Sequence, residues 1–398
     1  MGSGFFSHTI FLWAVESPQK NHSELSGLYI HIPFCKQACH YCDFHFSTNQ
    51  RRKTEMVAAI CREIALRKDY LDGDALQTIY FGGGTPSLLD TPEMEAIFGA
   101  ILRNFTVDAN AEITLEANPD DLSPEKISEL AALPVNRLSI GIQSFHEPHL
   151  RHMNRAHNAA EAETCVKSAQ DAGFANITLD LIYGIPHADH SVWQRDLQKA
   201  LALQVPHISA YCLTIEPKTV FGKWMEQRKI QPATEDFAAE QAEMLTATLE
   251  NAGYEQYEIC NFARNGNYAR HNSGYWLRKK YLGAGPSAHS FNGVSRQHNV
   301  AGNAPYVKAI GENSIPKITE TLTVAEHIND YLLTSLRTRW GCDLGVLQAE
   351  WSHNLLETNR QYIADCLQRQ LLVLENGILK LTRTGRLLAD EITATLFV

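Results

Sequence analysis

The sequence predicts an α/β protein in which an open barrel of six β/α units precedes a smaller, mainly helical domain. Six short runs of β-forming residues recur before residue 215, and stretches with the helix period separate them. Strands that alternate with helices in this way indicate parallel βαβ units, and six units fit an open barrel better than a closed barrel of eight. The six runs are Leu28–Pro33, Thr78–Phe81, Glu112–Ala117, Arg137–Ile142, Ile177–Ile182 and Ile208–Leu213.

The stretches between these runs carry start and stop signals for helices. Thr91-Pro92 and Ser123-Pro124 each predict an N-cap residue followed by proline at the first helical position. Gly173 predicts the end of a helix that reaches Ala172. The predicted helices are Thr54–Lys68, Pro92–Arg103, Pro124–Leu133, Ala159–Ala172 and Val192–Leu203.

After residue 215 the regular alternation stops. Residues 254–316 are rich in Gly, Asn, His and Tyr and show little periodicity, whereas Leu371–Thr382 predicts a hairpin that turns at Asn376-Gly377. Helices are predicted at Phe237–Asn251, within Val324–Leu371 and at Leu387–Leu396. We therefore expect four parts: an N-terminal extension (1–26), the barrel (27–235), a connecting region (236–316) and a C-terminal helical, winged-helix-like domain (317–398).

The charge disfavours a nucleic-acid-binding protein. The 398 residues include 35 Lys and Arg against 45 Asp and Glu, which gives a net charge of −10. Winged-helix modules can bind DNA, but residues 340–398 hold five basic and seven acidic side chains. Because phosphate contacts need clustered positive charge, a packing or partner-docking role is favoured over a DNA-binding regulator.

The N-terminal segment predicts no export or membrane anchor. Its apolar run, residues 5–15, is too short to cross a hydrocarbon core of about 30 Å. No Lys or Arg precedes this run, and the first arginine is Arg51, which disfavours a signal peptide and a mitochondrial presequence. We expect a cytoplasmic protein with no stable transmembrane segment, and leave open a transient membrane association and a monomeric or homodimeric state.

The most specific pattern is Cys35-x3-Cys39-x2-Cys42, directly after the first predicted strand. Nine cysteines, an odd number, indicate free thiols or metal ligands rather than a disulfide framework. A zinc site would need a fourth ligand, for which His40 and His45 are nearby. An iron–sulfur cluster held by three thiolates instead leaves one iron open to another ligand. The spacing resembles that of the radical S-adenosylmethionine (SAM) superfamily, in which the methionine amino and carboxylate groups chelate that iron.

Residues at the ends of later strands could bind SAM. The turn Gly82–Pro86 lets the backbone approach a ligand closely. Glu116 could accept hydrogen bonds from ribose hydroxyls, and Arg155 could pair with the methionine carboxylate. Gln143 and Asp180 are polar residues in apolar surroundings. Each fits a structural polar group equally well, and their joint placement favours a pocket.

From about residue 27 onward the chain resembles the oxygen-independent coproporphyrinogen III oxidase-like group of radical SAM proteins. The resemblance rests on YIHIPFCKQACHYCDF, GGGTPS, LEANP, SIGIQSF, DLIYGIP, HISAYCLTIEP, YEQYEI, RHNSGYW and LGAGPSAHSF. It implies Cys35, Cys39 and Cys42 as [4Fe-4S] ligands and Tyr29, Gly84, Thr85, Glu116, Gln143, Arg155, Asp180 and Ala210 as SAM contacts. Gly83 belongs to the same glycine turn, and Tyr41 could stack near the adenine.

Phe44 distinguishes two branches of this group. The dehydrogenases carry a fourth cysteine at this position, and they have a longer N-terminal region than the 27 residues that precede Leu28. Both differences disfavour the alternative function, the oxidative decarboxylation of coproporphyrinogen III to protoporphyrinogen IX. Resemblance to the heme chaperone (HemW) branch implies heme binding and delivery to acceptor hemoproteins such as respiratory enzymes. It leaves open whether the chain is an enzyme, and no catalytic residue is assigned.

The segment Arg270–Trp276 is the candidate heme site, and its HNxxYW pattern is linked with heme in that branch. His271 can ligate iron, Tyr275 and Trp276 offer flat surfaces, and four cations within residues 270–280 could pair with propionates. A structural histidine with packing aromatics is the alternative interpretation. Competing heme ligands are His289, Cys212 and Cys260.

Overall fold

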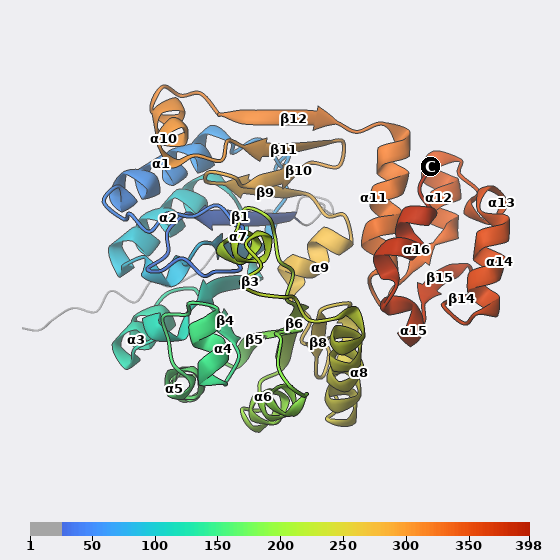
Figure 1. Ribbon diagram of the computed structural model, residues 1–398. Coiled ribbons are helices and arrows are strands. Elements are labelled where there is room, and N and C mark those ends of the chain that lie inside the picture. The colour runs from blue at the N-terminus through green and yellow to red at the C-terminus, as the bar shows by residue number, and fades with distance from the viewer. Residues whose placement is uncertain (1–25) are drawn as a thin grey trace, which may run out of the picture.

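The computed structural model describes residues 26–398, in which one large open sheet forms the centre of the molecule (Figure 1). Six neighbouring strands of this sheet run parallel and follow each other in chain order. Each contains or closely overlaps one of the six predicted runs, so the predicted β/α alternation is confirmed. The strands are β1 (Ser26–Ile32), β2 (Leu76–Gly83), β3 (Val107–Ala117), β4 (Arg137–Gln143), β5 (Asn176–Tyr183) and β6 (His207–Cys212). Apart from Ser26, the predicted N-terminal extension lies outside the described residues.

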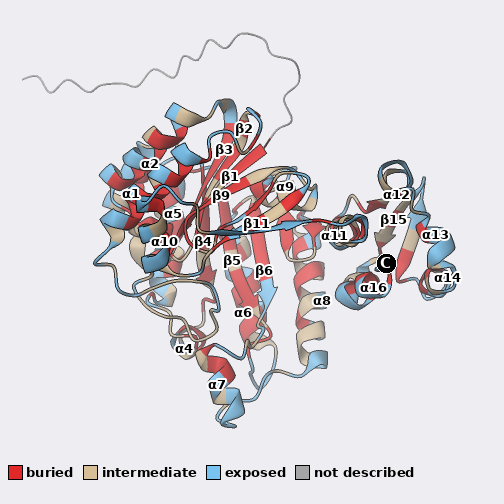
Figure 2. Cartoon of the chain, turned by 90° about the horizontal axis from the view of Figure 1, so that it is seen from above, coloured by how far each residue is buried: buried red, intermediate tan, exposed pale blue. Residues whose placement is uncertain are grey.

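Helices cover the outer face of these strands, and Figure 2 shows the strands buried behind them. On β1, the outward side chains Leu28, Ile30 and Ile32 are at most 1% exposed and belong to the same apolar core as Ile60. The inward side of the same strand carries Tyr29 and His31. The covering helices are α1 (Lys53–Leu66), α2 (Thr91–Asn104), α3 (Pro124–Ala131), α5 (Ala159–Asp171), α6 (Ser191–Ala202) and α8 (Glu235–Asn251), with 3-10 turns at Pro86–Leu88 and Pro119–Asp121. Two further helices, α4 (Glu147–His152) and α7 (Val220–Glu226), instead pack in a separate apolar cluster, and the Phe221 amide of α7 donates to the His40 carbonyl of the loop after β1.

The predicted cap of α2 is wrong by one residue. Thr91 is the first residue of the helix, and Asp90 is its N-cap. The Asp90 carboxylate accepts a bond from the Glu93 amide, and the Glu93 side chain accepts one from the Asp90 amide. This reciprocal capping box satisfies two amides at once, which a threonine hydroxyl one residue later does not do. At α3 the predicted cap, Ser123, is confirmed.

The large sheet extends beyond the barrel strands on both sides, which the sequence did not predict. At one edge β9 pairs parallel with β1, and three antiparallel strands follow it. At the other edge β8 and β7 continue antiparallel from β6, so β12 and β7 form the two edges and the barrel is open. The added elements are β7 (Glu255–Glu258), β8 (Asn261–Ala263), α9 (Arg270–Trp276), β9 (Tyr281–Ala284), β10 (His289–Phe291), β11 (Ser295–Asn299), α10 (Asn303–Gly311) and β12 (Lys317–Thr321).

The last part of the chain has its own apolar core and a three-stranded sheet, and it stands beside the barrel (Figure 1). The predicted turn at Asn376-Gly377 is confirmed, with φ of 52° and 80° at the two residues. The predicted final helix Leu387–Leu396 is confirmed as α16, which starts two residues later, and a short unpredicted helix, α15, precedes it. The elements are α11 (Val324–Leu336), β13 (Cys342–Asp343), α12 (Leu344–Trp351), α13 (Leu355–Thr358), α14 (Arg360–Gln368), β14 (Leu372–Glu375), β15 (Ile378–Leu381), α15 (Arg383–Arg386) and α16 (Ala389–Thr395).

Glu63 joins α1 to the sheet extension. Its side chain is fully buried and accepts bonds from Tyr306 Oη at 2.6 Å, Asn299 Nδ2 at 2.7 Å and the Gly285 amide at 2.8 Å. Arg67, the residue that follows α1, places its Nη1 3.3 Å from Glu63 Oε1 and also donates to the Gly283 carbonyl. These donors satisfy the buried carboxylate group, and the network ties residues 283–306 to the barrel.

Replacing Glu63 with alanine should therefore strongly destabilise the protein. The change removes the carboxylate partner of the buried Arg67 guanidinium and an acceptor of three further buried donors, which costs about 3–5 kcal/mol. Urea unfolding would measure this loss. Glu55→Ala on the same helix is the control, because Glu55 is exposed and should change the free energy of unfolding by less than about 0.5 kcal/mol. Equal unfolding midpoints for Glu63→Ala and the wild type would contradict this assignment.

Candidate functional site

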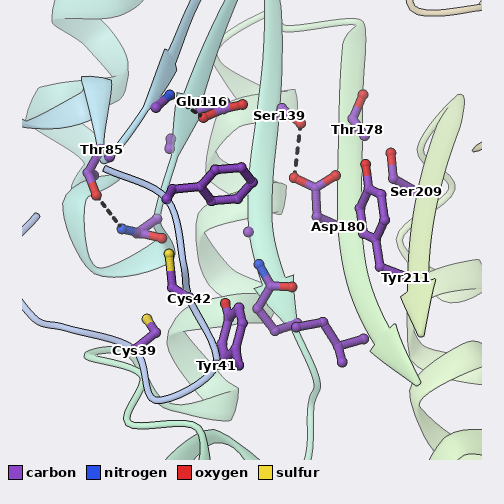
Figure 3. A pocket seen from close by; sticks show the side chains of 18 of the residues that line it. Cys39, Tyr41, Cys42, Thr85, Glu116, Ser139, Thr178, Asp180, Ser209 and Tyr211 are labelled. Carbon is purple, nitrogen blue, oxygen red and sulfur yellow. Dashed lines mark hydrogen bonds between the residues drawn. The ribbon is translucent and has the colours of Figure 1, made fainter. Parts of the chain in front are cut away.

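The three motif cysteines lie on the loop between β1 and α1, at the carboxyl end of the first barrel strand. All three thiols are partly buried, and all three line one cavity of about 490 Å³. Figure 3 shows two of them, Cys39 and Cys42, at this cavity. The hydroxyl of Thr85 donates to Cys35 Sγ at 3.3 Å, and Arg155 Nη1 donates to Cys39 Sγ at 3.4 Å. The loop therefore presents its sulfur atoms to the cavity with polar donors already directed at two of them.

The donor set fits an iron–sulfur cluster. Burial raises the pKa of Cys35 to about 11 and that of Cys42 to about 12, so both thiols stay protonated until a cation replaces the proton. Among residues 26–398 no three His, Cys, Asp or Glu side chains are arranged around a single metal ion. A cluster does not require that arrangement, because each thiolate binds a different iron.

The two histidines considered for a zinc site are bonded to other groups. His40 Nδ1 lies 2.9 Å from the His152 carbonyl oxygen, and its ring packs edge-on against Trp224. His45 Nε2 lies 2.9 Å from Asn303 Oδ1. These contacts direct a ring nitrogen of each histidine to a neighbour outside the cysteine loop.

The glycine turn after β2 holds the cysteine loop in place. A Cβ atom on Gly84 would lie 2.6 Å from the Phe34 carbonyl oxygen, a distance that real Cβ atoms do not adopt. The Gly84 amide donates to the Ile32 carbonyl at 2.8 Å, and Gly83 has a φ of +105°. The sequence predicts that this turn approaches a ligand closely, whereas in the structure Gly84 approaches the backbone that follows β1. This contact places Thr85 against Cys35.

Glu116, on β3, faces the cavity beside this turn. Its Oε1 accepts a bond from Tyr80 Oη at 2.7 Å, and its Oε2 accepts one from the Gly83 amide at 3.2 Å. Burial raises the pKa of Glu116 to about 7, Asp180 raises it further, and the two hydrogen bonds oppose the shift. A carboxylate held in this way has free lone pairs for the hydroxyl groups of a ligand.

Arg155 and Asp180 complete the polar lining. Arg155 Nη2 donates to Asn118 Oδ1 at 2.6 Å and to the Gly141 carbonyl at 2.7 Å, while its buried Nε has no protein partner. Asp180, on β5, accepts a bond from the Ser139 hydroxyl at 3.0 Å, and burial raises its pKa to about 6. An unsatisfied buried guanidinium nitrogen is what an anionic ligand group would satisfy.

The predicted SAM residues do not all reach the cavity. The lining includes Tyr41, Gly83, Gly84, Thr85, Glu116, Gln143, Arg155 and Asp180. The side chain of Ala210 instead lies in the apolar core, because Ser209 and Tyr211 take the inward positions of β6. Tyr29 faces inward but lies behind Tyr80, with ring centroids 6.1 Å apart.

Several cavity residues were missed by the sequence analysis although a signal was present. Tyr80 precedes the glycine turn by two residues and Asn118 follows Glu116 by two, so both share a face with predicted residues. Ser139 on β4 and Ser209 on β6 stand at inward positions on the two strands that flank Asp180. Because side chains two positions apart share one face of a strand, each of these residues could have been predicted from its spacing to an inward-facing neighbour.

The HNxxYW segment forms α9, and it meets the cavity from the side opposite the cysteines. Asn272 and Ala269 line the cavity, whereas His271 is only 3% exposed. His271 Nδ1 lies 2.7 Å from Thr78 Oγ1, and Nε2 lies 2.7 Å from Tyr275 Oη. Burial lowers the pKa of His271 to about 3, so the ring is neutral and both of its nitrogens are bonded.

Three of the four basic side chains in residues 270–280 have partners in the protein. Arg278 lies 3.6 Å from Asp330, and Lys280 lies 3.3 Å from Asp74. The Arg270 guanidinium donates to the Asn110 carbonyl at 2.7 Å. Of the flat side chains, Trp276 packs beneath the Arg337 guanidinium at 4.8 Å, and its buried indole nitrogen has no partner.

The other heme-ligand candidates belong to other elements than α9. His289 is exposed on β10 and stacks on His298 with ring centroids 5.4 Å apart. Cys212 is exposed at the end of β6 and lines the large cavity. Cys260 is partly buried next to β8.

Comparison with known proteins agrees with the fold and shows the family. Residues 29–198 match the Radical SAM superfamily model, and residues 322–388 match the HemN C-terminal domain. The solved structure of coproporphyrinogen III oxidase (HemN) from Escherichia coli, described as a radical SAM enzyme, superposes with a TM-score of 0.82 at 23% identity, over 94% of this chain and 91% of that one. This likeness concerns the fold alone.

Two curated relatives carry the name heme chaperone HemW. The protein from Bacillus subtilis is 33% identical over 376 residues, which cover 92% of this chain and 98% of the relative. The protein from Escherichia coli K12 is 38% identical over 265 residues, 66% of this chain and 69% of the relative. The chain therefore belongs to the HemW family of radical SAM proteins.

Proposed function

We propose that this protein is a heme chaperone that binds a [4Fe-4S] cluster, SAM and heme, and that delivers heme to acceptor hemoproteins such as respiratory enzymes. The observation that carries the proposal is the single cavity that extends from the three cysteines to α9. The heme chaperone name of the family's relatives supports the same conclusion. We expect delivery to take place in the cytoplasm, and among residues 26–398 no helix is long and apolar enough to span a bilayer.

The cluster end of the cavity has residues for each part of SAM. Cys35, Cys39 and Cys42 would hold three irons, which leaves the fourth iron for the methionine group of SAM. Arg155, with its unpartnered Nε, suits the methionine carboxylate, and Glu116 suits the ribose hydroxyls. A reduced cluster can supply an electron for cleavage of the sulfonium, and no residue here is assigned a role in that chemistry.

At the other end, we propose α9 as the heme contact, with His271 as iron ligand and Tyr275 and Trp276 against the macrocycle. In this structure both ring nitrogens of His271 are bonded. Ligation therefore requires α9 to turn away from β2, which breaks the bond to Thr78. His289, Cys212 and Cys260 remain the competing ligands.

Decarboxylation of coproporphyrinogen III is the alternative function. Phe44 stands where the dehydrogenases carry a fourth cysteine, and its side chain is 69% exposed at the cavity. A phenyl ring cannot replace a thiol as a metal ligand or hydrogen-bonding group. This substitution is the reason that we place heme transfer first.

Titration with hemin tests the proposal. The anaerobically reconstituted chain should bind heme, and His271→Ala should lower the affinity at least about tenfold and change the heme spectrum, because an iron ligand is removed. His289→Ala serves as the matched control and should leave both unchanged. An unaltered affinity and spectrum in His271→Ala would exclude His271 as the ligand.

The same preparation decides between the two functions. With SAM, a reductant and coproporphyrinogen III it should form no protoporphyrinogen IX. A heme-loaded sample should transfer its heme to an apo-hemoprotein. Product formation without heme transfer would reverse the order of the two functions.

Cluster assembly should depend on each motif cysteine. Cys39→Ala should retain little iron and sulfide after reconstitution, because two thiolates hold a cluster poorly and the Arg155 guanidinium loses its sulfur acceptor. Cys61→Ala on α1 is the control and should retain the full complement. Iron and sulfide analysis gives the comparison, and equal contents in the two variants would contradict the assignment.

SAM binding should weaken as the pH falls through about 7. The ribose hydroxyls donate to Glu116, so SAM binds the ionised form, and this form is lost below the raised pKa. Tyr80, the Gly83 amide and Asp180 are the other groups that act on this carboxylate. Isothermal titration of SAM on either side of pH 7 measures the dependence.

Glu116→Gln is the matched variant for this measurement. It keeps the size of the side chain but cannot ionise, so SAM should bind about tenfold more weakly above pH 7 and the pH dependence should flatten. A variant with the wild-type pH dependence would show that another group titrates.

A further inference from the structure

Tyr80 contacts both ends of the cavity at once. It lies in β2, two residues after Thr78, so the two side chains point to the same inner face. The Tyr80 hydroxyl donates to Glu116 Oε1 at 2.7 Å. Its ring lies nearly parallel to the His271 ring, with centroids 4.9 Å apart and an angle of 22° between the planes. One aromatic side chain therefore separates the ribose carboxylate from the candidate heme ligand.

His271 is held in its closed position from three directions. Thr78 and Tyr275 occupy its two ring nitrogens, and Tyr80 covers its face. The Glu112 carboxylate on β3 accepts bonds from the His271 amide at 2.9 Å and the Arg270 amide at 3.1 Å, which fixes the start of α9. An imidazole with both nitrogens bonded cannot ligate iron, so heme ligation and this closed position exclude each other.

The Glu116 bond fixes where the Tyr80 ring lies. Glu116 Oε2 is held by the Gly83 amide, so the carboxylate has a defined orientation and anchors the phenol through Oε1. A ligand that keeps Glu116 ionised strengthens this anchor, because a bond to a charged acceptor is stronger than one to a neutral acid. The ring is then pinned against His271.

We propose that Tyr80 is a positioning residue that makes SAM and heme bind antagonistically: SAM on Glu116 keeps α9 closed, and opening of α9 for heme loosens the SAM site. The proposal rests on the heme function proposed above. It assigns SAM a regulatory use that needs no cleavage, since SAM binding favours release of heme to an acceptor. By linkage, heme must weaken SAM binding by the same factor as SAM weakens heme binding.

Hemin titrations of the anaerobically reconstituted full chain, with and without saturating SAM, test the antagonism. In the wild type SAM should weaken heme binding about 5- to 100-fold, a common range for coupling between two sites. Tyr80→Phe keeps the ring but loses the bond to Glu116, so the ratio should approach one. SAM titrations with and without hemin must give the same ratios.

Tyr254→Phe is the matched control. It also removes one buried phenol hydrogen bond, from Tyr254 Oη to the Val205 carbonyl at 2.6 Å, but it lies away from the cavity and α9. This variant should keep the wild-type ratio. A merely structural role of Tyr80 would change stability in both variants and leave the ratio in place.

Thr78→Val gives an independent readout. It removes one of the bonds that close α9 while keeping the side-chain shape, so heme affinity without SAM should rise about fivefold. A purely structural role of Thr78 predicts weaker binding instead.

The outcomes separate this inference from the proposed function. Absence of heme binding under all conditions would overturn both. Heme binding with equal affinity in the presence and absence of SAM would overturn the antagonism alone. A wild-type ratio in Tyr80→Phe would remove Tyr80 from it.

Discussion

The candidate site depends on the close approach of Gly84 to the chain that leaves β1. No side chain fits between Gly84 and the Phe34 carbonyl, so the turn after β2 and the cysteine loop pack backbone against backbone. This contact sets Thr85 on Cys35 and directs the Gly83 amide at Glu116. The position of the first thiol and the orientation of the carboxylate therefore follow from one backbone contact. Any residue larger than glycine would separate them.

The barrel interior shows how the fold tolerates buried charge. Each strand alternates, with apolar side chains against the helices and polar ones toward the cavity. Arg155 lies beside thiols that lose protons when a cluster binds, and Glu116 and Asp180 keep pKa values of about 7 and about 6. The pKa values of the two carboxyl groups lie near neutral pH because burial raises them while hydrogen bonds lower them. A polar ligand would offset the desolvation cost of these buried groups through hydrogen bonds and charge. Apolar side chains that filled the barrel would not.

Local patterns predicted the barrel well, and nonlocal pairing set the limit of prediction. The strand-end rule reached Cys35, Glu116, Arg155 and Asp180, because parallel strands bring their carboxyl ends to one edge. It could not predict β9, because a strand as short as Tyr281–Ala284 carries no periodicity of its own. Its partner, Gly27–Ile30, also lies far away in the sequence. Ala210 shows a different limit: the resemblance names a residue, whereas the side chain that reaches the cavity there is Tyr211.

The interpretation of the candidate heme segment, Arg270–Trp276, differs most between the sequence and the structure. The sequence presents His271, Tyr275 and Trp276 as a candidate binding surface, but in the fold His271 and Tyr275 bond to each other and Trp276 packs on Arg337 of the C-terminal domain. Arg278 also reaches across, to Asp330 on α11. The segment thus lies between the barrel and the C-terminal domain and contacts both. A rotation of α9 that frees His271 would have to loosen these contacts as well. Heme binding at α9 would therefore also change the contacts that Trp276 and Arg278 make with the C-terminal domain.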